Sequence, residues 1–134
     1  MTTPRQQHIL LVDDDEAVRS VLRRGLVRAG YEVREAGEGG AALKLLASAP
    51  ADLVINDLVM PGMEGIEFIM ALRKTNPKLP VIAMSGGGRI GGPDNYLKIA
   101  CACGAARILT KPFDLAQLVG LVQELIGPPP SAGA

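Results

Sequence analysis

The stretch that decides the fold is Leu53-Val54-Ile55-Asn56-Asp57, which a tight Met60-Pro61-Gly62 turn follows after two residues. Its first three residues form a continuous apolar run, which is typical of a strand with both faces buried. Such strands lie inside parallel sheets, between two layers of helices, and ligands bind beyond their carboxyl ends. Asp57 stands at that end of the strand, so we expect its carboxylate to be either a helix cap or a reactive group.

Apolar runs and amphipathic segments alternate along the rest of the chain. Strands are expected at residues 9–12, 31–36, 53–57, 81–85 and 108–110, and helices at about 16–29, 40–49, 65–75, 93–102 and 115–126. Each crossover is long enough to return parallel and right-handed. The first, third and fourth strands are apolar throughout, whereas the second and fifth are weaker and suit the edges. The predicted fold class is therefore α/β, a doubly wound five-stranded parallel sheet of order 2-1-3-4-5, flavodoxin-like, with five helices.

Helix boundaries and buried faces can also be predicted from the residue pattern. Asp15 suits the N-cap of the first helix, and Gly30 suits its end. A spacing of three and four predicts one apolar stripe on that helix, made of Val18, Val21, Leu22, Gly25, Leu26 and Ala29. On the third helix we expect Ile66, Ile69 and Met70 to face the core.

The composition bounds the size and the class of the protein. With 134 residues, 48% of them hydrophobic, the chain suits one domain at 8–126, between a flexible N-terminus at 1–7 and a disordered Pro/Gly/Ala tail at 127–134. Lys plus Arg equals Asp plus Glu at 14 each, which argues against a general nucleic-acid binder. No apolar run approaches the roughly 18 residues of a membrane span, and no secretion signal opens the chain. We therefore expect a cytoplasmic protein that binds neither nucleic acid nor membrane, with Cys101 and Cys103 as packing residues.

Acidic residues follow two strands that are neighbours in this predicted sheet. Asp13 and Asp14 follow the first strand and Asp57 ends the third, so all three should meet at the point where the strand order reverses. Two unit charges about 4 Å apart repel by about 4 kcal/mol at an effective dielectric near 20, so either one carboxylate stays protonated or a cation lies among them. Such oxygen ligands suit Mg²⁺. Ser85 and Lys111 come from the ends of the fourth and fifth strands and offer groups that hold a phosphoryl oxygen, which together indicates a phosphoryl-transfer site.

These residues, in this order, resemble the receiver domain of two-component response regulators. The resemblance covers about residues 9–126 and rests on Val12-Asp13-Asp14, on Asp57 with Met60-Pro61-Gly62 and Gly65, on Ser85-Gly86, and on Lys111-Pro112-Phe113. Each motif alone is weak, but all four in order at the carboxyl ends of strands are highly specific. The resemblance implies a single-domain response regulator, a phosphorylation-dependent switch that is no enzyme beyond catalysing its own phosphoryl transfer and dephosphorylation.

The resemblance also implies a role for each matching position. Asp57 would be the phosphoacceptor, and Lys111, with a cis bond to Pro112, would pair with the phosphoryl group. The ligands of Mg²⁺, or of Mn²⁺, would be Asp13, Asp14, Asp57 and the backbone carbonyl of Val59. The Ser85 hydroxyl would swing toward the phosphoryl oxygen and shift the surface formed by the fourth helix, the fifth strand and the fifth helix.

Two positions depart from the family pattern. Members commonly carry Tyr or Phe three residues before the lysine, where this chain has Ile108, so the aromatic half of the switch made by Ser85 and Ile108 is expected to differ. The loop at 86–92 is rich in glycine and slightly long, which predicts a mobile fourth helix and an unusual output face.

The partners implied by the resemblance are proteins. A sensor histidine kinase or a histidine phosphotransfer protein would supply the phosphoryl group, and an unidentified downstream protein would receive the signal or the phosphoryl group. Only eight residues follow Ile126, so we expect no attached output domain. The chain is expected to be a monomer or a weak dimer.

Other functions fit parts of the pattern. Asp13 and Asp15 also form the D-x-D pattern of haloacid-dehalogenase-like phosphatases, with Asp13 as nucleophile and Asp15 as acid, but that class needs a later acidic pair and a cap domain. A pseudo-receiver would bind partners without being phosphorylated, which the full set of acids, Ser85 and Lys111 argues against. The glycine run at 86–91 matches a dinucleotide fingerprint only in form, because it follows the fourth strand instead of the first.

Overall fold

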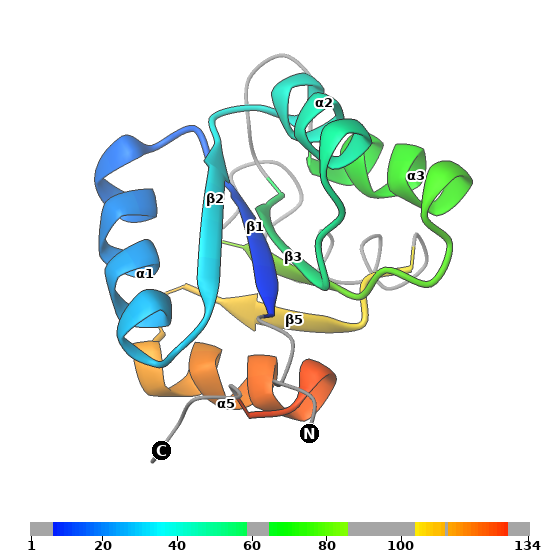
Figure 1. The fold of residues 1–134 in the computed structure, drawn as a ribbon. Helices are drawn as coiled ribbons and strands as arrows, with labels where there is room; N and C mark the ends of the chain where they lie inside the picture. Colours follow the sequence, from blue (N-terminus) through cyan, green and yellow to red (C-terminus); the bar gives the residue numbers. More distant parts are fainter. Residues whose placement is uncertain (1–6, 59–64, 86–103, 112, 129–134) are drawn as a thin grey trace.

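A computed structural model describes residues 7–58, 65–85, 104–111 and 113–128 of the chain (Figure 1). The strands in these ranges are β1 (His8–Val12), β2 (Glu32–Ala36), β3 (Leu53–Asp57), β4 (Val81–Ser85) and β5 (Arg107–Thr110). The helices are α1 (Glu16–Arg28), α2 (Gly39–Ser48), α3 (Gly65–Thr75) and α5 (Leu115–Ile126). The helix predicted at 93–102, the loop at 86–92 and both cysteines lie outside the described residues.

The five strands form one parallel sheet of order β2-β1-β3-β4-β5, which confirms the predicted topology. The register sets Leu11 beside Ile55 and Asp57 beside Met84. Because β1 and β3 are neighbours although β2 separates them in the chain, the strand order reverses between them. A site at this reversal collects residues that follow β1 and residues that end β3.

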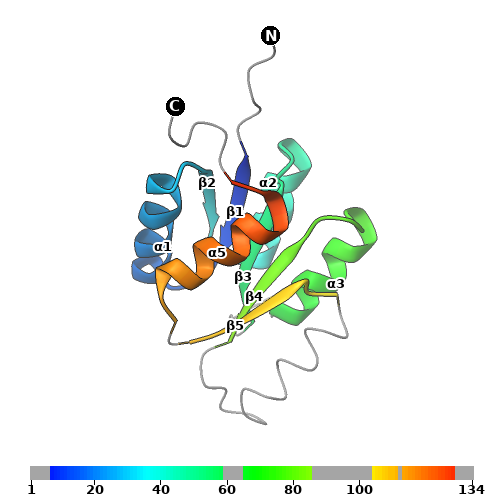
Figure 2. The same ribbon diagram turned by 90° about the horizontal axis from the view of Figure 1, so that it is seen from below.

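Helices cover both faces of the sheet, in three layers (Figures 1 and 2). On one face α2 and α3 bury a cluster that includes Leu10, Val12, Ala42, Val54, Phe68, Ile69 and Leu72. On the other face α1 and α5 bury a cluster that includes Ile9, Leu11, Leu22, Leu26, Ile55, Leu118 and Val122. Successive residues of β1 and β3 point to opposite faces, so strands that are apolar at every position supply both cores at once.

The ends of α1 form as the sequence predicts. The Asp15 carboxylate accepts hydrogen bonds from the backbone N–H groups of Ala17 at 2.9 Å and Val18 at 3.2 Å, which caps the first turn. Gly30 follows the helix with a φ of 111°, a backbone conformation that side chains other than glycine rarely adopt. No helix in the described ranges has the length and apolarity needed to cross a bilayer.

The predicted apolar faces of α1 and α3 are each wrong at one residue. Val21 is 60% exposed and Met70 is 52% exposed. On α3 the buried residues are Gly65, Phe68, Ile69 and Leu72, whose spacing of three and four places Met70 on the outer surface. The stripe on α1 is narrower than predicted and centres on Leu22 and Leu26.

A clasp of two hydrogen bonds joins the residues just before β1 and β2 to the end of α5. The Gln7 side-chain amide donates to the carbonyl of Ile126, and the buried Tyr31 hydroxyl donates to the carbonyl of Gly127 at 2.9 Å. Burial also raises the pKa of Tyr31, so the hydroxyl keeps the proton that it donates. This clasp lies at the amino ends of the strands, opposite to their carboxyl ends (Figure 2).

Candidate functional site

Three carboxylates meet where the strand order reverses. Asp13 and Asp14 directly follow β1, and Asp57 is the last residue of β3. Each carboxylate offers an oxygen that lies within 4.8 Å of an oxygen of the other two. Asp13 is fully buried, Asp57 is 8% exposed, and Asp14 is exposed. The cluster therefore has a buried side at Asp13 and Asp57 and an exposed side at Asp14.

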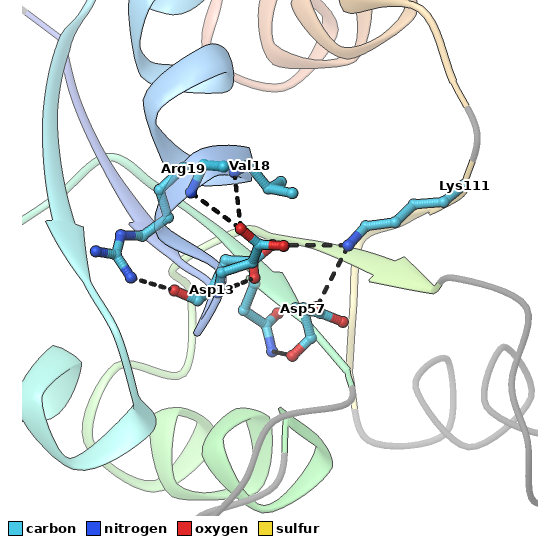
Figure 3. Close-up of polar contacts among 8 residues, drawn as sticks. Asp13, Val18, Arg19, Asp57 and Lys111 are labelled. Carbon is cyan, nitrogen blue, oxygen red and sulfur yellow. Dashed lines mark hydrogen bonds and ion pairs between the residues drawn. The ribbon is translucent and has the colours of Figure 1, made fainter.

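Lys111 brings a positive charge to this cluster from the edge strand β5. It directly follows β5, and its side chain extends past the end of β4 to reach the acids (Figure 3). The Nζ atom lies 3.3 Å from Oδ2 of Asp57 and 3.6 Å from Oδ2 of Asp13. Among the described residues, this ammonium faces two of the three carboxylates, so three acids and one lysine together keep a net negative charge.

The charged form of the Asp13 carboxyl is disfavoured in this arrangement. Burial raises the pKa of its carboxyl above the ordinary value, and the charges of Asp57 and Asp14 raise it further, against the lowering effect of the Asp15 backbone N–H and of Lys111. The Asp15 N–H donates to Oδ1 at 2.9 Å, whereas Oδ2 accepts no hydrogen bond from any described residue. A buried carboxylate oxygen without a donor is suited to a cation ligand.

The donor set fits a small hard cation. Mg²⁺ binds oxygen ligands at about 2.1 Å, so two of its ligand atoms lie at most about 4.2 Å apart. Neighbouring ligands of an octahedral ion lie about 3.0 Å apart, so the carboxylate oxygens, which lie within 4.8 Å of one another, would move closer together around the ion. Asp13, Asp14 and Asp57 can therefore hold such an ion, which would neutralise the charge that Lys111 leaves unbalanced.

Replacing Asp13 by asparagine is expected to stabilise the metal-free protein at neutral pH by about 1 kcal/mol, a typical gain when charge strain at a functional site is relieved. Because the folded-state pKa is raised, the Asp13 carboxyl favours folding below its unfolded pKa, and this contribution is lost as the pH rises through the folded pKa. Urea unfolding in EDTA should therefore show wild-type stability falling relative to Asp13→Asn as the pH rises above about 4, the ordinary pKa of an aspartate. Added Mg²⁺ should raise the melting temperature of the wild type only. If the unfolding free energies of the two proteins changed with pH in parallel, Asp13 would not be the carboxyl group whose charged form is disfavoured.

Asn56 and Gly65 support the backbone around Asp57. Sequence reasoning missed Asn56 and named Gly65 only as part of the family motif. The buried Asn56 side-chain amide donates to the carbonyls of Asp57 at 3.4 Å and Gly65 at 3.3 Å, which ties together both ends of the segment between β3 and α3. Gly65 packs directly on that backbone, since a Cβ there would lie 2.3 Å from the Asp57 carbonyl oxygen and 2.4 Å from the Leu58 Cα. A polar residue within an otherwise apolar strand was the signal that could have indicated Asn56.

Arg19 was also missed by sequence reasoning. Its Nη1 donates to the backbone carbonyl of Asp13 at 2.6 Å (Figure 3). Its Nε donates to Oε1 of Glu35 at 3.2 Å. Arg23 pairs with the other oxygen of Glu35 at 3.0 Å. The available signal was the spacing of the two arginines, which puts both on one face of α1.

The structure places the remaining predicted site residues only in part. Ser85 ends β4 opposite Thr110 of β5, while its side chain lies outside what the structure describes. Val59 and Pro112 also lie outside the described residues. Ile108 is half-buried in β5 and packs against the core beneath α2 and α3, where it makes apolar contacts.

Comparison with known proteins gives one family for almost the whole chain. Residues 9–123 match the family described as the response regulator receiver domain. A DNA-binding transcriptional regulator NtrC from Azospirillum brasilense is 38% identical over 129 residues, which cover 92% of this chain and 25% of that protein. The response regulator MprA from Mycolicibacterium vanbaalenii is 38% identical over 88% of this chain and 49% of that protein. The chain thus spans from a quarter to half of the length of these relatives.

Solved structures with the same fold are also similar in sequence. The chemotaxis protein CheY4 from Vibrio cholerae aligns with a TM-score of 0.82 and 31% identity, over 91% of this chain and 100% of that chain. The receiver domain of NtrX from Brucella abortus aligns with a TM-score of 0.80 and 28% identity, over 87% of this chain and 96% of that chain. These comparisons agree with the sheet order and the fold of the described chain.

Proposed function

Because the chain belongs to the receiver domains of two-component response regulators, we propose that Asp57 accepts a phosphoryl group from a phosphohistidine. Receiver domains are signalling domains, and the phosphorylated aspartate is the state that carries the signal. The observation that supports this assignment is the position of Asp57, which ends the central strand between the lysine and two further carboxylates. The exposed side of the cluster leaves room for a donor to approach.

The residues around Asp57 divide the chemistry among them. An oxygen of the Asp57 carboxylate forms a bond to phosphorus as the N–P bond of the donor breaks, and the electron pair returns to the imidazole nitrogen. Lys111 holds a phosphoryl oxygen by its charge, and Ser85 is proposed as a hydroxyl donor at the end of β4. Asp13, Asp14, Asp57 and the Val59 carbonyl would hold Mg²⁺ or Mn²⁺, which supplies charge neutralisation to the phosphoryl oxygens.

The donor and the receiver of the signal are proposed to be proteins. A histidine kinase or a histidine phosphotransfer protein would present the phosphohistidine at the exposed side of the cluster. The signal would leave through the face that includes β5 and α5, which an ion pair from Arg107 to Glu124 at 2.8 Å joins. Ile108 would report the change there through packing, because an aliphatic side chain has no polar end to transfer between solvent and core.

The test is phosphorylation by a small donor, without any kinase. The purified chain is incubated with acetyl phosphate and Mg²⁺, and the added phosphoryl group is followed by intact-mass spectrometry before and after hydroxylamine, which cleaves acyl phosphates. Peptide mapping should place the acyl phosphate on Asp57, and EDTA should prevent its formation. Labelling of Asp13 with continuous release of phosphate would instead support a phosphatase of the haloacid dehalogenase kind. The Asp15 carboxylate, which that reaction would use as an acid, caps α1 in this structure.

Replacing Lys111 by alanine is expected to slow labelling by roughly tenfold without abolishing it, because the metal still neutralises part of the phosphoryl charge. The same change removes the ion pairs at 3.3 Å and 3.6 Å that join β5 to β3 and β1. Phosphorylation should then no longer shift the amide NMR signals of β5 and α5, although Asp57 is modified. Lys44 on α2 provides the control, since Lys44→Ala leaves the acidic cluster unchanged. Normal labelling together with normal shifts in Lys111→Ala would show that the lysine is dispensable.

A further inference from the structure

Arg19 supports the acidic cluster from behind through the main chain. Its side chain is only 17% exposed, although it is charged and belongs to a surface helix. The guanidinium donates through Nη1 to the Asp13 carbonyl at 2.6 Å and through Nε to Glu35 at 3.2 Å. A Cβ added at Gly37 would lie 3.3 Å from Nη1, so the end of β2 closes tightly over the guanidinium.

Asp13 is held by a hydrogen bond at each of its polar groups except Oδ2. Its N–H donates to the Ala36 carbonyl at 3.1 Å, its Oδ1 accepts from the Asp15 N–H at 2.9 Å, and its carbonyl accepts from Arg19. The peptide that carries this carbonyl leads directly into Asp14. Fixing the carbonyl therefore fixes the orientation of both acids that follow β1, and leaves Oδ2 of Asp13 directed at the cluster.

We propose that Arg19 is a positioning residue for the divalent-cation site. Its guanidinium holds the peptide between Asp13 and Asp14 in the orientation that presents both carboxylates to one ion, and Glu35 holds the guanidinium in place. This inference rests on the proposed function in that the ion is the one needed for phosphorylation of Asp57. Partners of metal ligands of this kind commonly change metal affinity by about tenfold or more when they are removed.

The neighbouring Arg23 makes this proposal testable by the direction of an effect. Both arginines pair with Glu35, but only Arg19 contacts Asp13. Through charge alone, loss of either arginine leaves the cluster more negative and strengthens Mg²⁺ binding. Loss of positioning weakens it. The two explanations therefore predict opposite changes for Arg19, while Arg23 gives the effect of losing a charge without losing a contact to Asp13.

The experiment is isothermal titration of the unphosphorylated protein with MgCl₂ for the wild type, Arg19→Gln and Arg23→Gln. The dissociation constant for Mg²⁺ is expected to rise about tenfold in Arg19→Gln and to stay equal or fall slightly in Arg23→Gln. The Mg²⁺ concentration that half-saturates labelling by acetyl phosphate should rise by the same factor. The labelling rate at saturating Mg²⁺ should stay close to that of the wild type, because Arg19 does not contact the phosphoryl group.

Arg19→Lys gives a second variant that retains the charge and the aliphatic stem. Its ammonium cannot serve the Asp13 carbonyl and Glu35 with the fixed fork of a guanidinium, so we expect Mg²⁺ to bind about threefold more weakly than to the wild type. Should Arg19→Gln fail to fold, the Mg²⁺ affinity of Arg19→Lys decides whether the proposal holds. Equal or tighter Mg²⁺ binding in either Arg19 variant would overturn the proposal.

The titration also separates this proposal from the proposed function. Weakened Mg²⁺ binding in Arg19→Gln, together with a wild type that acetyl phosphate does not label, would support the positioning role and remove the phosphoacceptor role. Labelling of Asp57 with unchanged Mg²⁺ affinity in the Arg19 variants would support the phosphoacceptor role and remove the positioning role.

Discussion

Asp57→Asn is expected to reduce labelling by acetyl phosphate and Mg²⁺ to below about one hundredth of the wild-type level, because a carboxamide is not a nucleophile toward phosphorus. The substitution keeps the size of the side chain at a position that is 8% exposed. It also leaves Lys111 with Asp13 as an ion-pair partner at 3.6 Å. The fold is therefore expected to persist, and intact-mass spectrometry of folded protein should show no acyl phosphate.

Asp15→Asn is the matched control for this experiment. Asp15 lies two residues from Asp13, but its carboxylate caps α1 at 2.9 Å and 3.2 Å. Asparagine is about as good an N-cap as aspartate, so both stability and labelling should stay near those of the wild type. Undiminished labelling of Asp57→Asn would transfer the acceptor role to another carboxylate, with Asp13 as the first to be mapped.

Gly65→Ala is expected to destabilise the fold by about 3 kcal/mol, at the upper end of the usual cost of overpacking. The added methyl group would lie 2.3 Å from the Asp57 carbonyl oxygen and 2.4 Å from the Leu58 Cα, and these backbone atoms cannot move aside as a flexible side chain does. The start of α3 must therefore separate from the end of β3. The melting temperature should fall by roughly 10 °C, and labelling of the folded fraction should also slow, because the displaced backbone carries Asp57.

Gly120→Ala provides the comparison for Gly65→Ala. Gly120 lies in the exposed middle of α5, and a Cβ there would meet nothing within 4 Å. Alanine is better than glycine in a helix by about 0.8–1.0 kcal/mol, so this variant should be stabilised. The two alanine substitutions thus have opposite expected signs, and thermal unfolding followed by circular dichroism measures both. A Gly65→Ala variant as stable as the wild type would mean that the contact between α3 and β3 is looser than the structure gives.

The strands and their order could be predicted from the sequence because burial on two faces leaves a plain pattern. Runs such as Ile9 to Val12 and Val81 to Met84 are apolar at every position, and the weaker runs fall at the two edges of the sheet. Once that order is fixed, residues that follow β1, β3 and β5 must share one edge, which is why Asp13, Asp57 and Lys111 could be named together. The site prediction thus follows from topology and from the chemistry of those residue types.

The contacts that support the site could not be predicted in the same way. Arg19 and Glu35 are 16 residues apart, and their pairing depends on how α1 crosses β2. The bond from Asn56 to the Gly65 carbonyl depends on where the chain returns after β3. Met70 shows the related error on a helix, where hydrophobic character suggested a buried residue and the helical period places it outside. Side-chain pairing across elements is a property of the packed structure, which a linear pattern does not contain.

The clasp that Gln7 and Tyr31 make with the end of α5 has a practical consequence for biosensor design. A dye or a surface linker coupled at an exposed position near this clasp would be separated from the carboxylates by the length of β1, five residues or about 16 Å. Immobilised protein would then present its reactive edge to the solution unobstructed, and docking of a phosphohistidine donor could be followed in real time on the chip.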